Sequence, residues 1–382
     1  MIAKLGDVCT VVSGSTPKSA VPEYWDGDIK WITPAELSED TYVIYDSARH
    51  ITALGVSKTG LKPFPTGTVI LSSRAPIGKT AIAGCEMYCN QGFKNLICGE
   101  KVDSKYLYFF LSSKTDYLNS LGRGATFKEI SKAIVENVEI PLPELSEQRR
   151  IAACFEKLMH LIHLRKTELE EMDKLIKSRF IELFGDPLSN DKGWQKVLIT
   201  AVCNAIFGGG TPSKSHPEYF TGSIPWVSPK DMKSSVISDS IDHITEEAIA
   251  HSTTNLVPAN SVLMVIRSGI LKHTLPVAIN SVPVTINQDM KAFVPNEAVK
   301  KEFLMHYFKA IENDVLSGVR GVTADNIDFK AFQKRTVIVP PIALQEQFAA
   351  FVEQTDKSKL AVQKGLQELE ILKKSLMQQY FG

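Results

Sequence analysis

Residues 145–184, LSEQRRIAACFEKLMHLIHLRKTELEEMDKLIKSRFIELF, carry apolar side chains at alternating steps of four and three. Counted from residue 151, ten positions lie on this seam, and Arg165 and Arg179 are its only charged members. An apolar seam with this period predicts a long helix that pairs with another helix in a coiled coil. The eight apolar seam residues are Ile151, Phe155, Leu158, Ile162, Leu169, Met172, Ile176 and Leu183.

A second stretch, residues 344–381, has the same period. At about 1.5 Å per residue, roughly forty residues form a rod of about 60 Å, which would be exposed unless it were paired. We therefore expect the two helices to pair with each other. Besides Tyr380, the apolar seam residues of the second helix are Phe348, Val352, Val362, Leu366, Leu369 and Leu376.

Charged residues interrupt both seams, at Arg165 and Arg179 in the first and at Lys359 and Lys373 in the second. Each could pair with a Glu across the seam, or its stem could pack on the seam while its charge reaches water. A role in binding a specific partner is a third explanation.

The segments before the two helices resemble each other. Residues 14–34, GSTPKSAVPEYWDGDIKWITP, align without a gap to residues 209–229, GGTPSKSHPEYFTGSIPWVSP. Further matches follow in the same order: Arg74 with Arg267, Asn90-Gln91 with Asn287-Gln288, Lys94 with Lys291, Thr126 with Thr323, IPLPELSEQ (140–148) with VPPIALQEQ (339–347), and KSRFIELFG (177–185) with KSLMQQYFG (374–382). The repeat predicts the order domain, helix, domain, helix.

We place the boundaries at 1–143, 144–185, 186–341 and 342–382. In this order the first helix leads from one domain to the other and the second leads back. The pairing is therefore expected to be antiparallel, with the two halves related by a pseudo-twofold axis.

Each domain is expected to mix helices and strands, which gives an α+β fold class of two repeated mixed α/β domains. Apolar and β-branched runs predict strands at 68–71, 135–140, 261–266 and 336–339. Helical spacing predicts helices at 106–112 and 302–311.

Composition excludes several classes of protein. The net charge is zero, and Lys and Arg balance Asp and Glu in each of the four segments, so affinity for nucleic acid would have to come from local basic patches or from a partner. The sequence contains no apolar run long enough to span a membrane and no signal-peptide core, which predicts a cytoplasmic protein without membrane contact. The six cysteines are scattered, and no metal site is expected.

No catalytic constellation stands out. Residues 73–80, SRAPIGKT, resemble a phosphate-binding loop, but Ser73 occupies the place of the first glycine and the second copy loses the Gly-Lys pair. We therefore expect no catalytic residues and no enzyme activity in this chain.

The candidate binding residues are polar side chains at matching places in loops of the two copies. Arg and Lys bind phosphates or guanine edges, and Asn pairs with adenine. For any one of them, a solvated residue or one that fixes a loop is an equally good interpretation. The candidates are Lys18, Arg74, Lys79, Asn90, Lys94, Thr126 and Lys128 in the first copy, and Lys214, Arg267, Lys272, Asn287, Lys291 and Thr323 in the second.

Taken together, the paired GSTP/GGTP and PEYW/PEYF segments, the two helix starts and the Phe-Gly helix ends resemble the specificity subunit of type I restriction-modification systems. The resemblance covers essentially the whole chain. It implies that each globular copy recognises one half of a split site in double-stranded DNA, and that the helices set the spacing and dock two methyltransferase subunits.

The resemblance further implies that restriction subunits complete the endonuclease, and that S-adenosylmethionine, ATP and Mg²⁺ bind in partner subunits rather than in this chain. Two rivals remain open. One is an interaction scaffold with two binding globules, and the other is an enzyme with an unrecognised site in the divergent loops.

Overall fold

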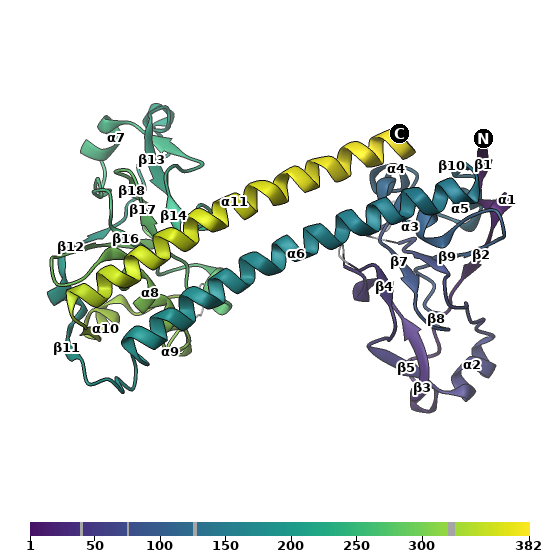
Figure 1. Ribbon diagram of the computed structural model, residues 1–382, viewed down its shortest axis with the longest axis horizontal. Coiled ribbons are helices and arrows are strands. Elements are labelled where there is room, and N and C mark those ends of the chain that lie inside the picture. The colour runs from purple at the N-terminus through teal and green to yellow at the C-terminus, as the bar shows by residue number, and fades with distance from the viewer. Residues whose placement is uncertain (39–40, 75, 125–127, 320–324) are drawn as a thin grey trace. The chain divides into compact units, whose positions relative to one another are not determined.

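The repeat in the sequence is a repeat of the fold. The computed structural model describes residues 1–38, 41–74, 76–124, 128–319 and 325–382, so Thr126 and Thr323 lie outside the described residues. The chain divides into two compact units, residues 1–166 with 364–382 and residues 167–363. Each unit holds one globular domain and part of each long helix (Figure 1). The four boundaries expected from the sequence stay a prediction.

The globular domain of the first unit contains a five-stranded sheet, a three-stranded sheet and a two-stranded ribbon. In the five-stranded sheet only the edge pair β4–β7 is parallel. Its order is β2 (Cys9–Ser13), β9 (Lys94–Cys98), β6 (Val69–Leu71), β7 (Thr80–Ala83), β4 (Val43–Ile44); the smaller sheet is β5 (Arg49–Ile51), β3 (Trp25–Ile32), β8 (Tyr88–Cys89); the ribbon is β1 (Ile2–Lys4) with β10 (Glu139–Pro141). Its helices are α1 (Leu5–Val8), α2 (Ala53–Thr59), α3 (Ser104–Ser113), α4 (Thr115–Ser120) and α5 (Lys132–Glu136).

The second unit repeats this topology, and within its large sheet the edge pair β14–β17 is again the one parallel pair. The five-stranded order is β12 (Cys203–Gly208), β19 (Met290–Pro295), β16 (Val262–Val265), β17 (Val277–Asn280), β14 (Val236–Ile237); the smaller sheet is β15 (His243–Ile244), β13 (Ile224–Val227), β18 (Thr285–Ile286); the ribbon is β11 (Gln195–Leu198) with β20 (Thr336–Val339). Its helices are α7 (Glu246–Ala250), α8 (Lys301–Ala310), α9 (Glu312–Ser317) and α10 (Phe329–Gln333). The expected α+β class of two repeated domains is confirmed.

One expected strand is wrong. Residues 135–140 were predicted to be a strand, but Val135 lies in α5 and only Glu139–Pro141 pairs as β10. The side chain of Ser131 explains the difference, because its oxygen accepts a hydrogen bond from the N–H of Ile134 at 3.3 Å and caps the helix.

Helices α3 and α8 are buried on nearly every side. In the first unit the ring of Phe109 on α3 stacks on Phe155 of the long helix, with centroids 5.0 Å apart. In the second, Phe303 on α8 lies 4.8 Å from Phe184 of the same helix. Because the sheet covers one face of each short helix and a long helix covers the other, both read as almost continuously apolar.

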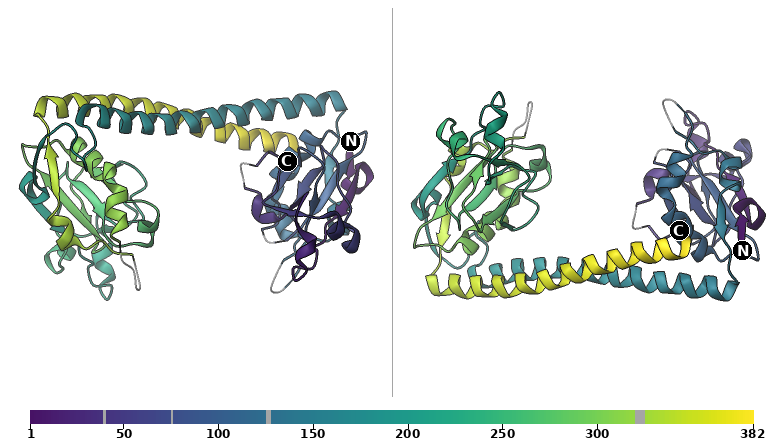
Figure 2. Two further views of the ribbon diagram at one scale, coloured as in Figure 1. Left: turned by 90° about the horizontal axis from the view of Figure 1, so that it is seen from below. Right: turned by 90° about the horizontal axis from the view of Figure 1, so that it is seen from above.

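The long helices are α6 (Leu145–Phe184) and α11 (Ile342–Phe381), of 40 residues each. In the first unit the Phe155 ring of α6 lies 5.8 Å from Phe381 at the end of α11. The C-terminal end of α11 lies beside the first globular domain (Figure 2). In the second unit Phe180 of α6 lies 5.5 Å from Phe348, near the start of α11. In both units the beginning of one helix therefore meets the end of the other, which is an antiparallel pairing.

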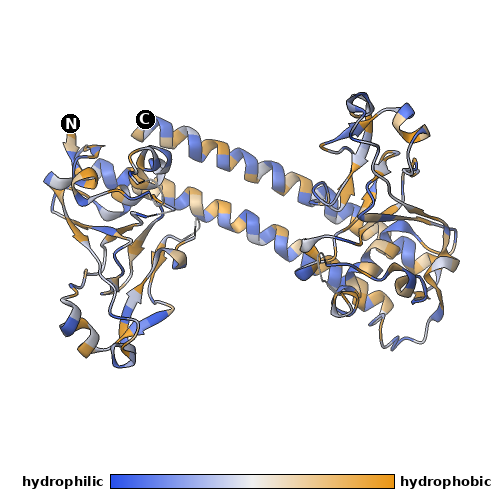
Figure 3. Ribbon diagram, turned by 180° about the vertical axis from the view of Figure 1, so that it is seen from behind, coloured by the Kyte–Doolittle hydropathy of each residue, from blue (hydrophilic) through white to orange (hydrophobic). Residues whose placement is uncertain are grey.

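None of the predicted apolar seam residues is exposed, and along both helices they alternate with polar ones (Figure 3). The charge at Lys359 is paired across the seam with Asp173 of α6, and lies 3.7 Å from Asp356 on its own helix. Of the three alternatives, pairing across the seam therefore holds for Lys359, with an Asp in place of a Glu. Arg179 pairs along its own helix with Glu182 at 2.7 Å. A Lys that is only 16% exposed and paired across the seam favours one register over others.

Gln148 joins the start of α6 to the first globular domain. Its side chain is fully buried, and its Oε1 accepts a hydrogen bond from the N–H of Asp103 at 2.9 Å. Its Nε2 donates to the carbonyl oxygens of Lys101 at 3.0 Å and Pro143 at 2.8 Å. The side-chain amide thus satisfies backbone groups that would otherwise be buried without partners.

Gln345 makes the same three contacts in the second unit. Its Oε1 accepts from Lys300 N–H at 2.9 Å, and its Nε2 donates to Ala298 O at 3.1 Å and Pro340 O at 2.8 Å. The sequence alignment paired Gln148 with Gln347 instead, and that pairing is wrong. The two helices correspond at a separation of 197 positions.

Candidate nucleic-acid interface

The repeated Thr-Pro and Asn-Gln segments hold each other in both domains. The hydroxyl of Thr16 hydrogen-bonds the side-chain oxygen of Gln91, and Thr211 does the same with Gln288. The preceding glycines have no room for a side chain, because a Cβ at Gly14 would overlap the carbonyl oxygen of Cys89, and one at Gly209 would overlap that of Asn287. The most visible repeated motif is therefore one that shapes loops.

The repeated tryptophans fix the same loops through hydrogen bonds to their backbone. The indole N–H of Trp31 donates to Ser15 O at 3.0 Å, and that of Trp226 donates to Gly210 O at 3.0 Å. Trp31 is only 2% exposed. Both rings therefore have a structural role.

Arg74 and Arg267 occupy the same place in the two domains. Arg74 follows β6, and its Nε donates to Glu129 Oε2 at 2.9 Å. Arg267 follows β16, and its Nε donates to Asp289 Oδ1 at 2.6 Å. Their side chains stay 44% and 48% exposed, so each guanidinium is held by one edge and open to solvent elsewhere.

Lys94 is a predicted binding residue that lies inside the domain. Its Nζ lies 3.3 Å from Ser73 Oγ and 3.3 Å from Glu129 Oε1, and only 8% of its side chain is exposed. Burial alone would raise the pKa of the Glu129 carboxyl, but hydrogen bonds from Arg74 and Lys94 outweigh it and lower that pKa. In the folded protein Lys94 therefore supports Glu129 from within the domain.

Two further lysines of the predicted set are also engaged by the protein. The ammonium group of Lys79 donates a hydrogen bond to the carbonyl oxygen of Leu37. Lys291, the counterpart of Lys94, lies over the ring of Phe329, with its Nζ 4.9 Å from the ring centroid. Both contacts agree with the loop-fixing interpretation rather than with free surface charge.

The two asparagines shape their own turns. Asn90 Oδ1 accepts from Gly92 N–H at 2.9 Å, and Asn287 Oδ1 accepts from Asp289 N–H at 3.1 Å. Asn287 is also buried, at 7% exposure. An Asn that closes such a turn and is buried is poorly placed to read an adenine.

The remaining predicted lysines are exposed. Lys272 lies 3.8 Å from Asp325, which leaves 67% of its side chain exposed. Lys18, Lys128 and Lys214 are exposed on loops. Among the members of the set that the structure describes, the two arginines and these four lysines are the ones that a polyanion could reach.

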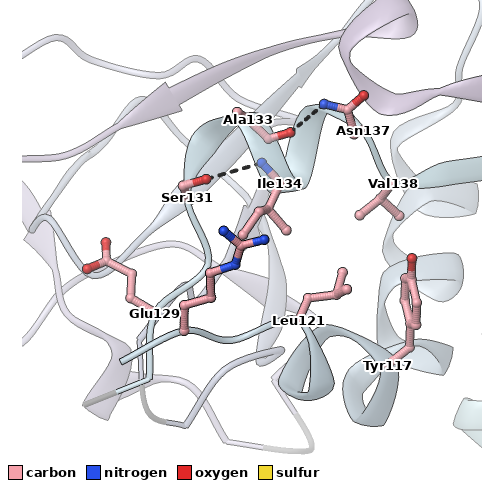
Figure 4. A pocket seen from close by; sticks show the side chains of 9 residues that line it. Tyr117, Leu121, Glu129, Ser131, Ala133, Ile134, Asn137 and Val138 are labelled. Atoms are coloured by element: carbon pink, nitrogen blue, oxygen red, sulfur yellow. Dashed lines mark hydrogen bonds between the residues drawn. The ribbon is translucent and has the colours of Figure 1, made fainter. Parts of the chain in front are cut away.

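A pocket of about 560 Å³ lies in the first unit beside Glu129 (Figure 4). Its walls come from α4, α5 and the segments next to them, and it is lined by Tyr117, Leu121, Arg123, Glu129, Ser131, Ala133, Ile134, Asn137 and Val138.

Within the described part of the chain no three His, Cys, Asp or Glu side chains gather to hold a metal ion. None of the helices described is long and apolar enough to cross a membrane.

Residues 1–174 and 191–371 match the family model described as the type I restriction modification DNA specificity domain. The chain belongs to this family. A relative from Methanocaldococcus jannaschii, the type I restriction enzyme MjaIX specificity subunit, is 30% identical over 400 residues, covering 98% of this chain and 91% of that protein. The EcoR124I/EcoR124II specificity subunit of Escherichia coli is 32% identical over 280 residues, covering 71% of this chain and 68% of that protein.

Solved structures share the fold of this specificity subunit. One, from work on complex assembly and conformational transition of the type I R-M system, has a TM-score of 0.62 at 20% identity and covers 100% of this chain and 97% of its own. Another, the S subunit from M. genitalium, has a TM-score of 0.60 at 15% identity, with coverages of 100% and 96%.

Comparing the two copies of the specificity subunit by identity alone missed Glu129 and Asp289, the acids that hold the arginines. Glu129 corresponds to Asn326, because the backbone of Arg74 forms an isolated β-bridge with Glu129 and the backbone of Arg267 forms the same bridge with Asn326. Asp289 corresponds to Gly92 in the Asn-Gln loop. Each copy has its acid at a position where the other copy has a non-acidic residue. Only the contacts show that both acids hold the equivalent arginine.

Proposed function

We propose that this chain is the DNA-reading subunit of a type I restriction-modification complex, and that each globular domain reads one half of a bipartite site. The observation that carries the proposal is the arginine held at the same place in both domains, half-exposed and fixed by an acid. Fixed guanidinium groups on loops suit direct readout of base edges. Membership of the specificity family supports DNA as the ligand.

The two half-sites should differ in sequence. Between the matching loops the copies diverge, most of all over residues 35–69 and 233–260. Because unlike loops present unlike donors and acceptors to the bases, the whole site should be asymmetric.

The long helices would set the distance between the half-sites and dock two methyltransferase subunits. Apolar side chains that lie outside the seam and are exposed in the single chain support a docking role. They are Leu161, Leu164, Leu175, Leu360, Ile371 and Leu372. S-adenosylmethionine would act in the methyltransferase subunits, and ATP and Mg²⁺ in restriction subunits that join them. The site of action would be the cytoplasm, where the DNA is.

Methylome sequencing tests the reading function. A host that carries this chain with its methyltransferase should show methylation at a split, asymmetric motif. Replacing residues 1–143 with the equivalent domain of a relative should change one half of the motif and leave the other. A continuous motif, or a change in both halves, would contradict the proposal.

Copurification separates the rivals. A methyltransferase that copurifies and modifies DNA in the presence of S-adenosylmethionine supports the proposal. If the chain brought down no methyltransferase and left methylation of the host DNA unchanged, a scaffold would be the better interpretation. Catalysis by the isolated chain would favour an enzyme.

A further inference from the structure

The acid that holds the arginine comes from a different segment in each domain. In the first domain it is Glu129, which precedes α5, and the Asn-Gln loop has Gly92. In the second it is Asp289 in the Asn-Gln loop, and the segment before α10 has Asn326. Both acids reach the same atom, the arginine Nε. Two different routes to one contact indicate that the contact itself matters.

The surrounding charges follow this exchange. In the first domain Glu129 also binds Lys94, so one carboxylate holds two cations. In the second domain the acid comes from the Asn-Gln loop, and Lys291 lies on the Phe329 ring instead. The arginine keeps its acid even though its neighbours are rearranged.

An acid bound at Nε fixes the direction of the guanidinium and leaves its terminal nitrogens available. Within the described part of the chain, no protein group hydrogen-bonds the two Nη atoms of Arg74 or Arg267. A nearby carboxylate weakens attraction for a phosphate, because the pair is close to neutral. It favours an acceptor that requires a fixed direction, and guanine offers two such acceptors, O6 and N7.

We propose that Glu129 and Asp289 are positioning residues that hold Arg74 and Arg267 for bidentate contact with a guanine, one in each half-site. The proposal rests on the DNA-reading function above. It adds the base and the residues that orient its reader. Because the two acids lie in different segments, each should be replaceable by the acid of the other domain.

The first experiment exchanges the acids. In the first domain E129N should release Arg74, and E129N/G92D should hold it again through the arrangement of the second domain. A Cβ at residue 92 would lie 3.0 Å from Asn90 Oδ1 and Pro34 Cγ, so these neighbours must shift by a few tenths of an ångström, and thermal unfolding of G92D shows whether the loop tolerates the change. In the second domain the matching pair is D289G and D289G/N326E.

Each variant is measured as the complex with its methyltransferase, by competition between the wild-type site and sites with each G·C pair replaced. E129N should reduce discrimination at one guanine of one half-site by about 10-fold, within the range expected for a bidentate pair. E129N/G92D should restore most of it, and the other half-site should not respond. D289G and D289G/N326E should do the same in the second half-site.

Control variants remove an exposed acid elsewhere in each domain: E139Q in the first and E297Q in the second. G92D alone should retain discrimination. Thermal unfolding of every variant shows whether the domain remains folded. R74A and R267A should lose discrimination at the same guanines as the acid variants, and no second acid should restore it.

The outcomes separate the two proposals. If the wild-type complex reads no bipartite site, the proposed function fails. If it does, but E129N behaves like E139Q, the positioning role is refuted. Equal weakening on all sequences with a lower salt dependence would show a phosphate contact and overturn the guanine assignment. Failure of both double variants to restore discrimination would also count against the positioning role.

Discussion

At the scale of single residues, His306 on α8 shows how burial sets charge. Its Nε2 is buried, with no partner among the described residues, and burial together with Lys309 and Lys359 lowers its pKa from 6.5 to about 3. Below pH 6.5 the His306 imidazole binds a proton in the unfolded chain but stays neutral in the folded chain. Stability should therefore fall as the pH drops from about 6.5 towards 3, by up to about 1.4 kcal/mol per pH unit.

Substituting His306→Phe, the residue found at the equivalent Phe109, should remove this loss. The variant should be about 1–2 kcal/mol more stable at neutral pH, because an unsatisfied buried nitrogen is gone, and the gain should grow at pH 5.5. Chemical denaturation at the two pH values measures it. His160→Phe, an exposed site on α6, is the control. A gain that does not depend on pH would contradict the assigned charge state.

The residues shared by the two copies predicted equivalent positions better than they predicted what each side chain does. The repeat located Arg74 and Arg267 correctly as a matched pair, because both copies retain the arginine. It also made Lys94 a candidate for DNA binding, whereas the pairing of β9 with β2 and β6 places Lys94 inside. Spacing in the sequence does not reveal which side of a short strand faces the core when both sides are covered.

At the scale of elements, Gln345 is expected to fix the start of α11. Gln345→Ala should lower the free energy of unfolding by about 2–3 kcal/mol, because a buried N–H and two carbonyl oxygens lose their partner. Gln347→Ala is a matched control, since that side chain is exposed two residues further along the same helix. Denaturant titration should show a large effect at 345 and almost none at 347. Equal effects would restore the alignment that pairs Gln148 with Gln347.

The helices were the most predictable elements. The seam gave the bounds of α6 correctly, because forty residues of one period leave little ambiguity. The alignment of the two helix starts was off by two residues, since Glu-Gln occurs at both Glu147-Gln148 and Glu346-Gln347 and sequence letters alone do not show which glutamine is buried. Strand ends were harder because local capping, as at Ser131, competes with pairing.

At the scale of the whole molecule, the balanced charge predicts that the chain depends on its partners for affinity. The isolated chain should bind its DNA site weakly, and methyltransferase subunits should tighten binding by adding phosphate contacts. Gel-shift titration with and without the methyltransferase measures the difference. Nanomolar, sequence-specific binding by the chain alone would contradict this expectation.

A second prediction at this scale concerns the spacing of the half-sites. Deleting residues 163–169 and 360–366 together removes one heptad from each helix and preserves the seam phase. Seven residues correspond to about 10 Å of helix, or roughly three base pairs at 3.4 Å per pair. The methylome should show a shorter gap between unchanged half-sites, or no methylation. An unchanged gap with full methylation would refute the proposed ruler.

The glutamines that join the helices to the globular domains have a consequence for inheritance. Gln148 lies three residues before Ile151, and Gln345 lies three residues before Phe348, the first seam residue of each helix. A crossover between related genes at either junction would therefore import a new globular domain already in phase with the old helices. Such recombinants need no compensating mutation in the coiled coil, so the architecture lets one half of the protein evolve by exchange while the other half stays as it was.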